Sequence, residues 1–352
     1  MMRLNDREWK DFAVPEIFQN IKRGKRLKNA DHISGKVPYI SSTANNNGVD
    51  DYIEASEGTR VFKNCISLAN SGSVGAAFYE PFAFVASDHV TSLGCKEANK
   101  YIYLFLTAVL KQQASNFNFN REINDIRIKK MRIMLPVTET EEPDYQFMED
   151  YVRELMAVKM KQYRVYIEAR LKFIRLDNTN QMGYRDRLKS CEWKAFRLED
   201  LFECTKGVYL PTDTVQDGDI PFITAKAGNN GVNGFIGNGI LFSGGRITIE
   251  KIRLSAYYQT RGFYCSHDVS VIYNEHLNEY NAQFIANIIM RNGSKYSYGR
   301  QAQLNVVKRE VIMLPVTDDG QPDYDFMEEA GKKMMLNKYD QYLRFLSSQE
   351  NV

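Results

Sequence analysis

Two arginines lie in matching sequence surroundings, and each could bind a phosphate or the edge of a base. Arg121 ends the stretch FNFNR, and Arg300 ends the stretch YSYGR and is followed by Gln301. The planar guanidinium group presents several donors at once and suits both phosphate and guanine. An arginine that satisfies a turn or a carboxylate inside its own domain would explain the same pattern, so both roles stay open.

Further polar side chains gather in short segments. Residues 22–28 hold five positive charges, whereas the matching stretch of the second half has Lys206 alone. The loop 41–48 (SSTANNNG) has a counterpart at 224–231 (TAKAGNNG), and the Gly-Ser loop 70–75 would let backbone approach a ligand. Asn-Gly pairs also make ordinary turns, which favours the positions upstream of them for recognition. Hydroxyl, amide and cationic groups donate to phosphates and base edges. We therefore predict nucleic-acid contacts through Lys22, Lys25, Arg26, Ser42, Thr43, Asn45, Asn46, Ser71, Ser73, Arg121, Lys206, Thr224, Lys226, Asn229, Arg246, Arg300 and Gln301.

Catalytic motifs are missing from the sequence. It has no phosphate-binding loop with Lys-Ser or Lys-Thr and no dinucleotide-binding glycine pattern. Its four histidines lack metal-ligand spacing, and no Asn-Pro dipeptide occurs that could hold a target amine. A nuclease site could be assembled only from the Pro-Asp at 143–144 and the Glu-Trp-Lys at 192–194, which are better explained as a helix start and a repeat start. We expect no catalytic residue and no metal site in this chain.

The candidate nucleic-acid contacts belong to a chain whose two halves repeat each other in sequence. EWKDF at 8–12 returns as EWKAF at 192–196, and VPYI at 37–40 returns as IPFI at 220–223. These matches are shifted by 184 and 183 residues; further along, a constant shift of 179 pairs residues 77–169 with 256–348 without a gap, and 27 of these 93 positions are identical. The densest match is MLPVT, then PDY, then FME. Internal repetition of this kind predicts that both halves share one fold.

In each half, the hydrophobic pattern changes from one typical of strands to one typical of a helix at the same place. Short runs of Val, Ile, Phe and Tyr broken by Gly, Asn and Ser predict strands and turns, interrupted by one helix at 100–114 and again at 279–291. After MLPVT, apolar residues recur at 148, 152, 155, 163, 167, 171 and 174, which predicts a helix of about 30 residues. Its counterpart runs to the C-terminus. We expect an α+β protein with mainly β domains at 1–140 and 191–319, long helices at 141–176 and 320–352, and a polar linker at 177–190.

A long helix with an apolar stripe must bury that stripe against something. We expect the two long helices to pair as a coiled-coil-like spacer with pseudo-two-fold symmetry, although packing of each on its own domain would also satisfy the stripe. Several apolar residues on these helices could instead be covered by a partner. The candidate partner-binding residues are Met148, Tyr151, Leu155, Met327, Met334 and Tyr339.

Bulk composition adds little about the ligand. The 352 residues carry 46 Lys and Arg against 44 Asp and Glu, so any affinity for a polyanion must come from local clustering. Five cysteines form no CxxC pair, and neither a signal peptide nor a membrane-spanning stretch is present. We expect a cytoplasmic protein.

Taken in order, the duplicated motifs resemble a known family. Two copies of EWK, (V/I)P(Y/F)I, NNGV, aromatic-x-aromatic-x-Arg, MLPVT and PDY, each closed by a helix, are similar to the DNA-specificity subunits of type I restriction-modification systems. The segment LPV…PDYxFM looks most like the BcgI-like, type IIB branch. The resemblance extends from Glu8 to about Leu346.

The resemblance implies a non-catalytic subunit in which each domain reads one half of a bipartite, asymmetric site in double-stranded DNA. The helices would space the domains and dock methyltransferase, or fused methyltransferase-nuclease, subunits, two per chain. S-adenosylmethionine and Mg²⁺ would belong to those partners. Domains that read one face of B-DNA should address half-sites about 34–36 Å apart. We expect a gap of about 5–7 unread bases between half-sites of about 3 or 4.

Two alternatives of other classes remain open at this point. A nuclease acting alone would cut DNA as the purified chain with a metal ion. A two-headed scaffold that binds only proteins would use Arg121 and Arg300 structurally, so that replacing them lowers stability without changing DNA binding.

Overall fold

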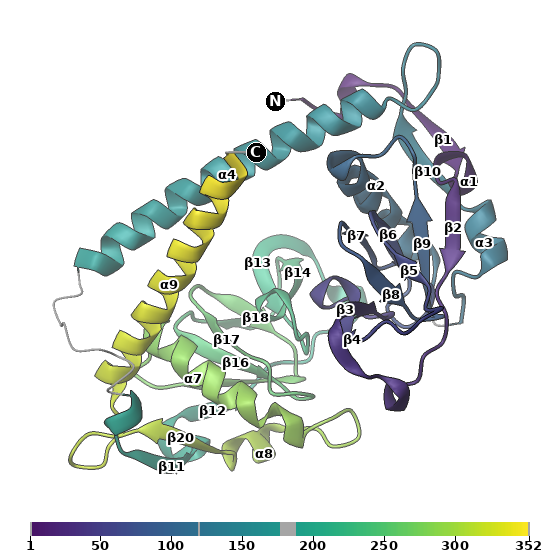
Figure 1. Ribbon diagram of the computed structural model, residues 1–352. Coiled ribbons are helices and arrows are strands. Elements are labelled where there is room, and N and C mark those ends of the chain that lie inside the picture. Colours follow the sequence, from purple (N-terminus) through teal and green to yellow (C-terminus); the bar gives the residue numbers. More distant parts are fainter. Residues whose placement is uncertain (1, 119, 177–187, 351–352) are drawn as a thin grey trace. The chain divides into compact units, whose positions relative to one another are not determined.

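The computed structural model describes residues 2–118, 120–176 and 188–350, so the expected linker at 177–190 falls largely outside the described residues. The chain divides into two compact units, Met1–Tyr163 and Arg164–Val352, here called domain 1 and domain 2. The division falls inside one long helix, so each domain is described by itself (Figure 1).

Domain 1 is built mainly from strands. These are β1 (Trp9–Ala13), β2 (Asn20–Arg23), β3 (Ser34–Ile40), β4 (Val49–Ile53), β5 (Val61–Phe62), β6 (Cys65–Ala69), β7 (Ala77–Glu80), β8 (Phe84–Ala86), β9 (Val90–Gly94) and β10 (Arg132–Pro136). Its helices are α1 (Val14–Ile17), α2 (Lys100–Gln112), α3 (Asp125–Lys130) and the first part of α4 (Tyr145–Leu176).

Domain 2 repeats this element order. Its strands are β11 (Trp193–Arg197), β12 (Glu203–Lys206), β13 (Asp217–Ile223), β14 (Val232–Ile236), β15 (Leu241–Phe242), β16 (Arg246–Glu250), β17 (Ala256–Gln259), β18 (Phe263–Cys265), β19 (Val269–Tyr273) and β20 (Val311–Pro315). Its helices are α6 (Leu198–Leu201), α7 (Glu279–Arg291), α8 (Leu304–Lys308), α9 (Tyr324–Glu350) and the end of α4.

The two domains have the same sheet topology. Domain 1 has a β1-β10 pair and two four-stranded sheets, ordered β2-β9-β6-β7 and β4-β3-β8-β5. Domain 2 has β11-β20, β12-β19-β16-β17 and β14-β13-β18-β15 in the same order. In both, a parallel pair sits among antiparallel ones, β3 with β8 and β13 with β18. The repeat read from the sequence is thus a repeat of fold, and both helices expected near 100–114 and 279–291 are confirmed as α2 and α7.

Each domain is layered as helix, sheet and sheet (Figure 1). In domain 1 the apolar face of α2 packs on the β2-β9-β6-β7 sheet through residues such as Leu106 and Leu93, both fully buried. The opposite side of that sheet meets the second sheet, where the tilted rings of Phe62 and Phe84 pack with their centroids 5.6 Å apart. One tryptophan in each domain packs on its helix in the same way, with Trp9 against Phe105 of α2. Domain 2 repeats the contact with Trp193 and Phe284 of α7.

The long helices satisfy their apolar stripes in two ways. Met148 and Val152 of α4 are buried in the core of domain 1, as Met327 of α9 is in the core of domain 2. Further along, Ile167, Leu171 and Ile174 of α4 pack within domain 2 against α9, where they contact Tyr339. Both modes expected from the sequence therefore occur, on different parts of the same helices. Tyr163, expected in the stripe, is 42% exposed.

Candidate nucleic-acid interface

The sequence-predicted contacts of domain 1 lie on loops at one end of its two larger sheets. The residues after β2, the β3-β4 loop, the β6-β7 loop and the β8-β9 turn are joined by backbone hydrogen bonds. Ser73 N donates to Ser42 O at 2.9 Å, Asn70 N donates to His89 O at 2.8 Å, and Lys25 N donates to Ala86 O at 3.1 Å. Segments far apart in sequence thus form one continuous surface.

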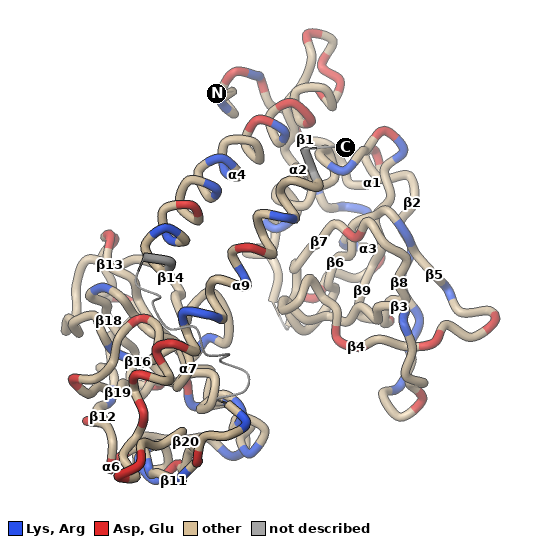
Figure 2. Tube along the Cα trace, turned by 60° about the vertical axis from the view of Figure 1, so that its left-hand side comes forward, with Lys and Arg blue, Asp and Glu red and all other residues tan. Residues whose placement is uncertain are grey.

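A hollow of about 350 Å³ lies among these loops. Arg26 and Lys28 line it from the basic run, Ser42 from the β3-β4 loop, and Asp88 and His89 from the β8-β9 turn. It is lined by groups of both charges and by hydroxyls, a mixture suited to base edges that carry donors and acceptors side by side. Lys25 and Lys22 are exposed outside it, and Figure 2 shows basic segments along β2 and after it.

Arg23, the remaining cation of the basic run, is used internally. Its Nε donates to the carbonyl of Asp88 at 2.5 Å, and its Nη1 lies 3.8 Å from a carboxylate oxygen of Asp125. Arg23 therefore holds the β8-β9 turn in place, which leaves its neighbours to face solvent.

The Gly-Ser loop has a different role from the one expected. A side chain at Gly72 would lie 2.7 Å from Ser42 Oγ, and one at Gly75 would lie 2.6 Å from Ala114 Cβ, so both glycines allow close internal packing. Ser71 is only 6% exposed, and a 2.6 Å hydrogen bond joins its Oγ to His89 Nδ1. The prediction that Ser71 contacts DNA through its side chain is therefore wrong; it orients His89, while Ser73 stays half-buried at the rim.

The backbone conformation of the Asn-Gly turns explains why asparagine occurs in them. Asn46 and Asn47 have φ of 49° and 53°, and Asn229 and Asn230 have φ of 52° and 56°. Asparagine tolerates this left-handed region better than most residues. The turn accounts for the identity of Asn46 and Asn229, although both side chains remain exposed beside the variable positions.

Arg121 and Arg300 occupy the same conformation in both domains. Each closes a short turn through a bridge, Asn118 with Arg121 and Ser297 with Arg300. Each guanidinium lies over an aromatic ring, 5.9 Å from the centroid of Phe117 and 6.0 Å from that of Tyr296. Both are exposed, and among the described residues neither is paired with a carboxylate. Each guanidinium thus lies at the outer limit of a cation–π contact, and its donors stay available for a phosphate or base.

These turns adjoin the loops already described. In domain 1, Ile123 N donates to Asn70 O at 2.9 Å, two residues after Arg121. In domain 2, Ala302 N donates to Lys251 O at 2.7 Å, two residues after Arg300. The arginine turn therefore belongs to the same surface as the loops in both domains.

Domain 2 holds its loops with other residues. Glu250 is buried, and its carboxylate accepts hydrogen bonds from the backbone N–H groups of Ile252, Arg253 and Ser255 at 2.6–3.1 Å. This carboxylate stabilises the turn that Gly-Ser forms in domain 1. In the 224–231 loop, Tyr257 Oη donates to the carbonyl of Ala227 at 2.7 Å. Lys226 and Asn229 are exposed on that loop, Thr224 is half-buried, and Lys206 is exposed at the end of β12.

Arg246 lies at the start of β16, where it pairs with Gln259. The loop after β16 adjoins the other end of that strand, where Glu250 pairs with Val269. Its guanidinium lies 4.5 Å from the centroid of Tyr273, and its Nε donates to Ser243 Oγ. Its strand partner Gln259 donates to the carbonyl of Asn230 in the 224–231 loop at 3.1 Å, so that loop reaches the neighbourhood of Arg246.

Two residues of the domain 1 surface were not expected from the sequence. His89 lines the hollow with its side chain 52% exposed, and Lys111 of α2 holds its Nζ 4.6 Å above the ring of Phe78, beside Gly48. Burial lowers the pKa of Lys111. The sequence gives a signal for His89, because the dipeptide Asp88-His89 is inverted to His267-Asp268 in the second half. It gives no such signal for Lys111.

The predicted partner-binding residues divide by burial. Met148 and Met327 have no exposed surface, and Tyr339 is 9% exposed between α4 and α9. These three pack within their own domains, so the prediction that they meet a partner is wrong. Tyr151, Leu155 and Met334 are half-buried and remain candidates.

Within the described residues no cluster of three or more His, Cys, Asp or Glu side chains could hold a metal ion, and no helix is long and apolar enough to cross a membrane.

Comparison with known proteins gives one family for both domains. The model of the type I restriction modification DNA specificity domain matches twice, at residues 6–163 and 191–342. The type II restriction enzyme specificity subunit S.BcgI of Heyndrickxia coagulans is 25% identical over 337 residues, which cover 93% of this chain and 94% of that protein.

Among solved structures, the S subunit of a type I restriction-modification system from M. genitalium has a TM-score of 0.40 and 16% identity over 99% of this chain and 94% of that one. The HsdS subunit of Thermoanaerobacter tengcongensis has a TM-score of 0.33 and 13% identity over 97% and 91%. Because both scores are below 0.5, the assignment depends on the sequence match to the domain family. Two matches that together span most of the chain show that it belongs to the type I restriction modification DNA specificity domain family, as a non-catalytic subunit with two target-recognition domains whose associated activities lie in partner subunits.

Proposed function

We propose that each domain reads one half of a bipartite, asymmetric site in double-stranded DNA. The observation that carries this proposal is the arginine turn, present in the same conformation in both domains, beside loops whose side chains differ between them. A shared arginine suits a shared contact, while different loops suit different bases. The contacts proposed are Lys22, Lys25, Arg26, Ser42, Thr43, Asn45, Asn46, Ser73 and Arg121 in domain 1, and Lys206, Thr224, Lys226, Asn229, Arg300 and Gln301 in domain 2.

The site should have a defined gap. Two recognition domains that address one face of B-DNA meet it once per helical turn, about 34–36 Å or 10–10.5 base pairs. We propose half-sites of about 3 or 4 base pairs separated by about 5–7 unread ones.

The partners proposed are two methyltransferase, or fused methyltransferase-nuclease, subunits per chain, acting in the cytoplasm. S-adenosylmethionine and Mg²⁺ would bind to those subunits. On α4, Val165 and Phe173 are each 60% exposed, and they offer a partner an apolar surface that the buried methionines do not. Met334 on α9 is a further candidate in domain 2, and Tyr151 and Leu155 are the candidates on the domain 1 part of α4.

The test is to co-express the chain with a methyltransferase subunit of the same organism, purify the complex, and map methylated bases in a random-sequence plasmid library. A split, asymmetric motif is expected. Arg121→Ala should then relax or weaken recognition of one half-site and Arg300→Ala the other. Arg246→Ala is measured beside them, because the guanidinium of Arg246 is held by Tyr273 and Ser243, and a smaller effect on the motif than that of Arg300→Ala is expected.

The outcomes separate the possibilities. Equal losses on every sequence, with a salt dependence shallower by about one unit, would make the arginines phosphate contacts within the same function. A continuous motif, or a much longer gap, would refute the bipartite spacing. Cleavage of DNA by the chain alone would refute the assignment of catalysis to partners.

A further inference from the structure

The two domains differ most sharply at one structurally equivalent place. After β2, Lys25 N donates to the carbonyl of Ala86 at 3.1 Å, and after β12, Val208 N donates to the carbonyl of Cys265 at 2.8 Å. These matched hydrogen bonds align the two segments residue by residue. Arg26 of domain 1 therefore corresponds to Tyr209 of domain 2.

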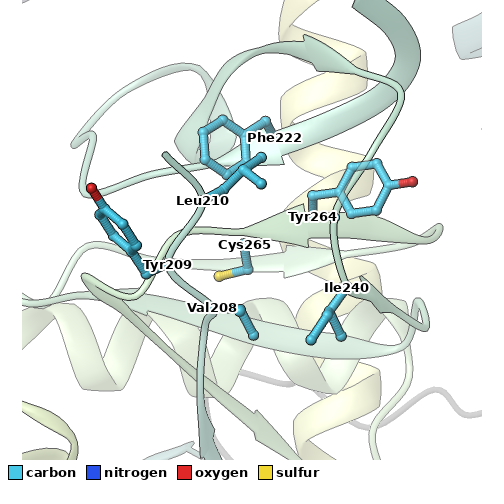
Figure 3. Close-up of a pocket in the computed structure, with 8 residues that line it drawn as sticks. Val208, Tyr209, Leu210, Phe222, Ile240, Tyr264 and Cys265 are labelled. Carbon is cyan, nitrogen blue, oxygen red and sulfur yellow. The ribbon is translucent and has the colours of Figure 1, made fainter. Parts of the chain in front are cut away.

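In domain 2 this place is an apolar pocket of about 130 Å³. Figure 3 shows the side chains that surround it, from the segment after β12, from β13 and β18, and from the residue before β15. They include Val208, Leu210, Phe222, Ile240 and Tyr264, and no charged side chain lines it. Tyr209 and Ile240 stand at its rim, 66% and 62% exposed. The hollow of domain 1 beside Arg26 is lined instead by charged and hydroxyl groups.

The pocket opens beside the candidate interface of its domain. The ring of Tyr209 meets that of His267 edge-on, with centroids 5.2 Å apart. The next residue, Asp268, pairs with Lys251 at 2.7 Å, and the carbonyl of Lys251 accepts the hydrogen bond from Ala302 that places the Arg300 turn. A DNA held by Arg300 would therefore have the rim of the pocket within the same continuous surface.

Among the groups that B-DNA presents in its major groove, the C5-methyl of thymine is the apolar one. We infer that this pocket is a specificity site that binds the methyl group of a thymine in the half-site read by domain 2. The inference rests on the proposed function and deepens it, because it names the chemistry that one domain recognises. The hollow of domain 1 shares with this pocket only the positions of Arg26, Leu27 and Tyr39, and its charged and hydroxyl groups would read the other half-site by hydrogen bonds.

The experiment uses the complex with its methyltransferase partner and duplexes carrying the mapped motif. Each thymine in the half-site that Arg300→Ala impairs is replaced in turn by deoxyuridine, which removes the methyl group alone. At one position, affinity should fall about fourfold, the effect expected for one buried methyl-sized group. Ile240→Ala should abolish this difference between thymine and deoxyuridine duplexes. Leu241→Ala is the control, since it shortens a neighbouring exposed side chain outside the pocket and should keep the difference.

Three results would overturn the inference while the proposed function stands: a half-site made only of G·C pairs, deoxyuridine without effect at every position, or a thymine preference that survives Ile240→Ala. Failure to obtain any methylation motif would instead refute the proposed function. Loss of the preference in Leu241→Ala but not in Ile240→Ala would place the methyl contact elsewhere and also overturn the inference.

Discussion

Glu80 is a buried carboxylic acid whose counterpart in the other domain is a neutral amide. Its side chain has no exposed surface; Oε1 accepts a hydrogen bond from Ser67 Oγ at 2.9 Å, and Oε2 has no partner among the described residues. Burial raises the pKa of Glu80 to about 7. Gln259 stands at the equivalent position in domain 2, where its amide donates to Asn230 O at 3.1 Å and to Thr248 Oγ1 at 3.0 Å.

The substitution Glu80→Gln should remove a pH-dependent weakness of domain 1. The native state holds the Glu80 proton more tightly than the unfolded chain does, so the contribution of Glu80 to stability is full below pH 4.5 and is lost as pH rises through 7. A pKa difference of about 2.5 units corresponds to about 3 kcal/mol in the free energy of unfolding. Glutamine never ionises, so the variant should be more stable than the parent by up to about 3 kcal/mol at pH 8, with much less difference at pH 5.

The two tryptophans allow each domain to be followed in the full chain. With Trp193→Phe as background, the fluorescence of Trp9 reports urea unfolding of domain 1, because Trp9 stacks on Phe105 in its core. Curves are measured at pH 5 and pH 8 with and without Glu80→Gln. The reciprocal control is Gln259→Glu in a Trp9→Phe background, which should weaken domain 2 at pH 8. A gain of the same size at both pH values, or none at pH 8, would refute the argument from ionisation.

Three further predictions concern domain 2. Leu171→Ala should lower its free energy of unfolding by about 2–4 kcal/mol by opening the α4-α9 contact, whereas Phe173→Ala, at a 60% exposed position, should change it by less than about 0.5 kcal/mol; Trp193 fluorescence in urea distinguishes them. Gly207→Ala would place a Cβ 2.1 Å from the carbonyl oxygen of Ser266 and should cost about 1–3 kcal/mol in the same assay, and a neutral result would mean that the backbone relaxes freely. Burial raises the pKa of the Cys265 thiol to about 12, so a disulfide reagent at pH 8 should label this cysteine only after unfolding, and rapid labelling of the native protein would contradict its placement.

Features set by chain periodicity could be predicted from the sequence. Local sequence patterns predict the duplication, the helices α2 and α7, and the long helices after each MLPVT. Such patterns do not depend on where the tertiary structure places the element. Arg121 and Arg300 could be singled out for the same reason, because one turn occurs twice with the same arginine.

Burial of individual side chains could not be predicted in this way. Met148 and Met327 begin their helices against a domain core, while Val165 and Phe173 face outward, and the apolar pattern alone does not say which core each turn meets. Ser71 looked like a donor on a flexible loop, but it became a buried support of His89 because Gly72 packs against Ser42. The sequence also does not show that the guanidinium of Arg246 lies against Tyr273 and Ser243.

The late contact between α4 and α9 has a consequence during protein synthesis. Ile167, Leu171 and Ile174 pack against a helix whose Tyr339 lies about 165 residues further along the chain. At 5–20 residues per second, a ribosome needs roughly 10–30 s to make that stretch. Domain 1 and the first half of α4 can fold in that interval, but this apolar stripe lacks the cover that α9 gives it until α9 emerges, although Tyr280 of α7 in the same cluster is made earlier. The nascent chain therefore exposes an apolar helical segment for long enough that a chaperone can bind it.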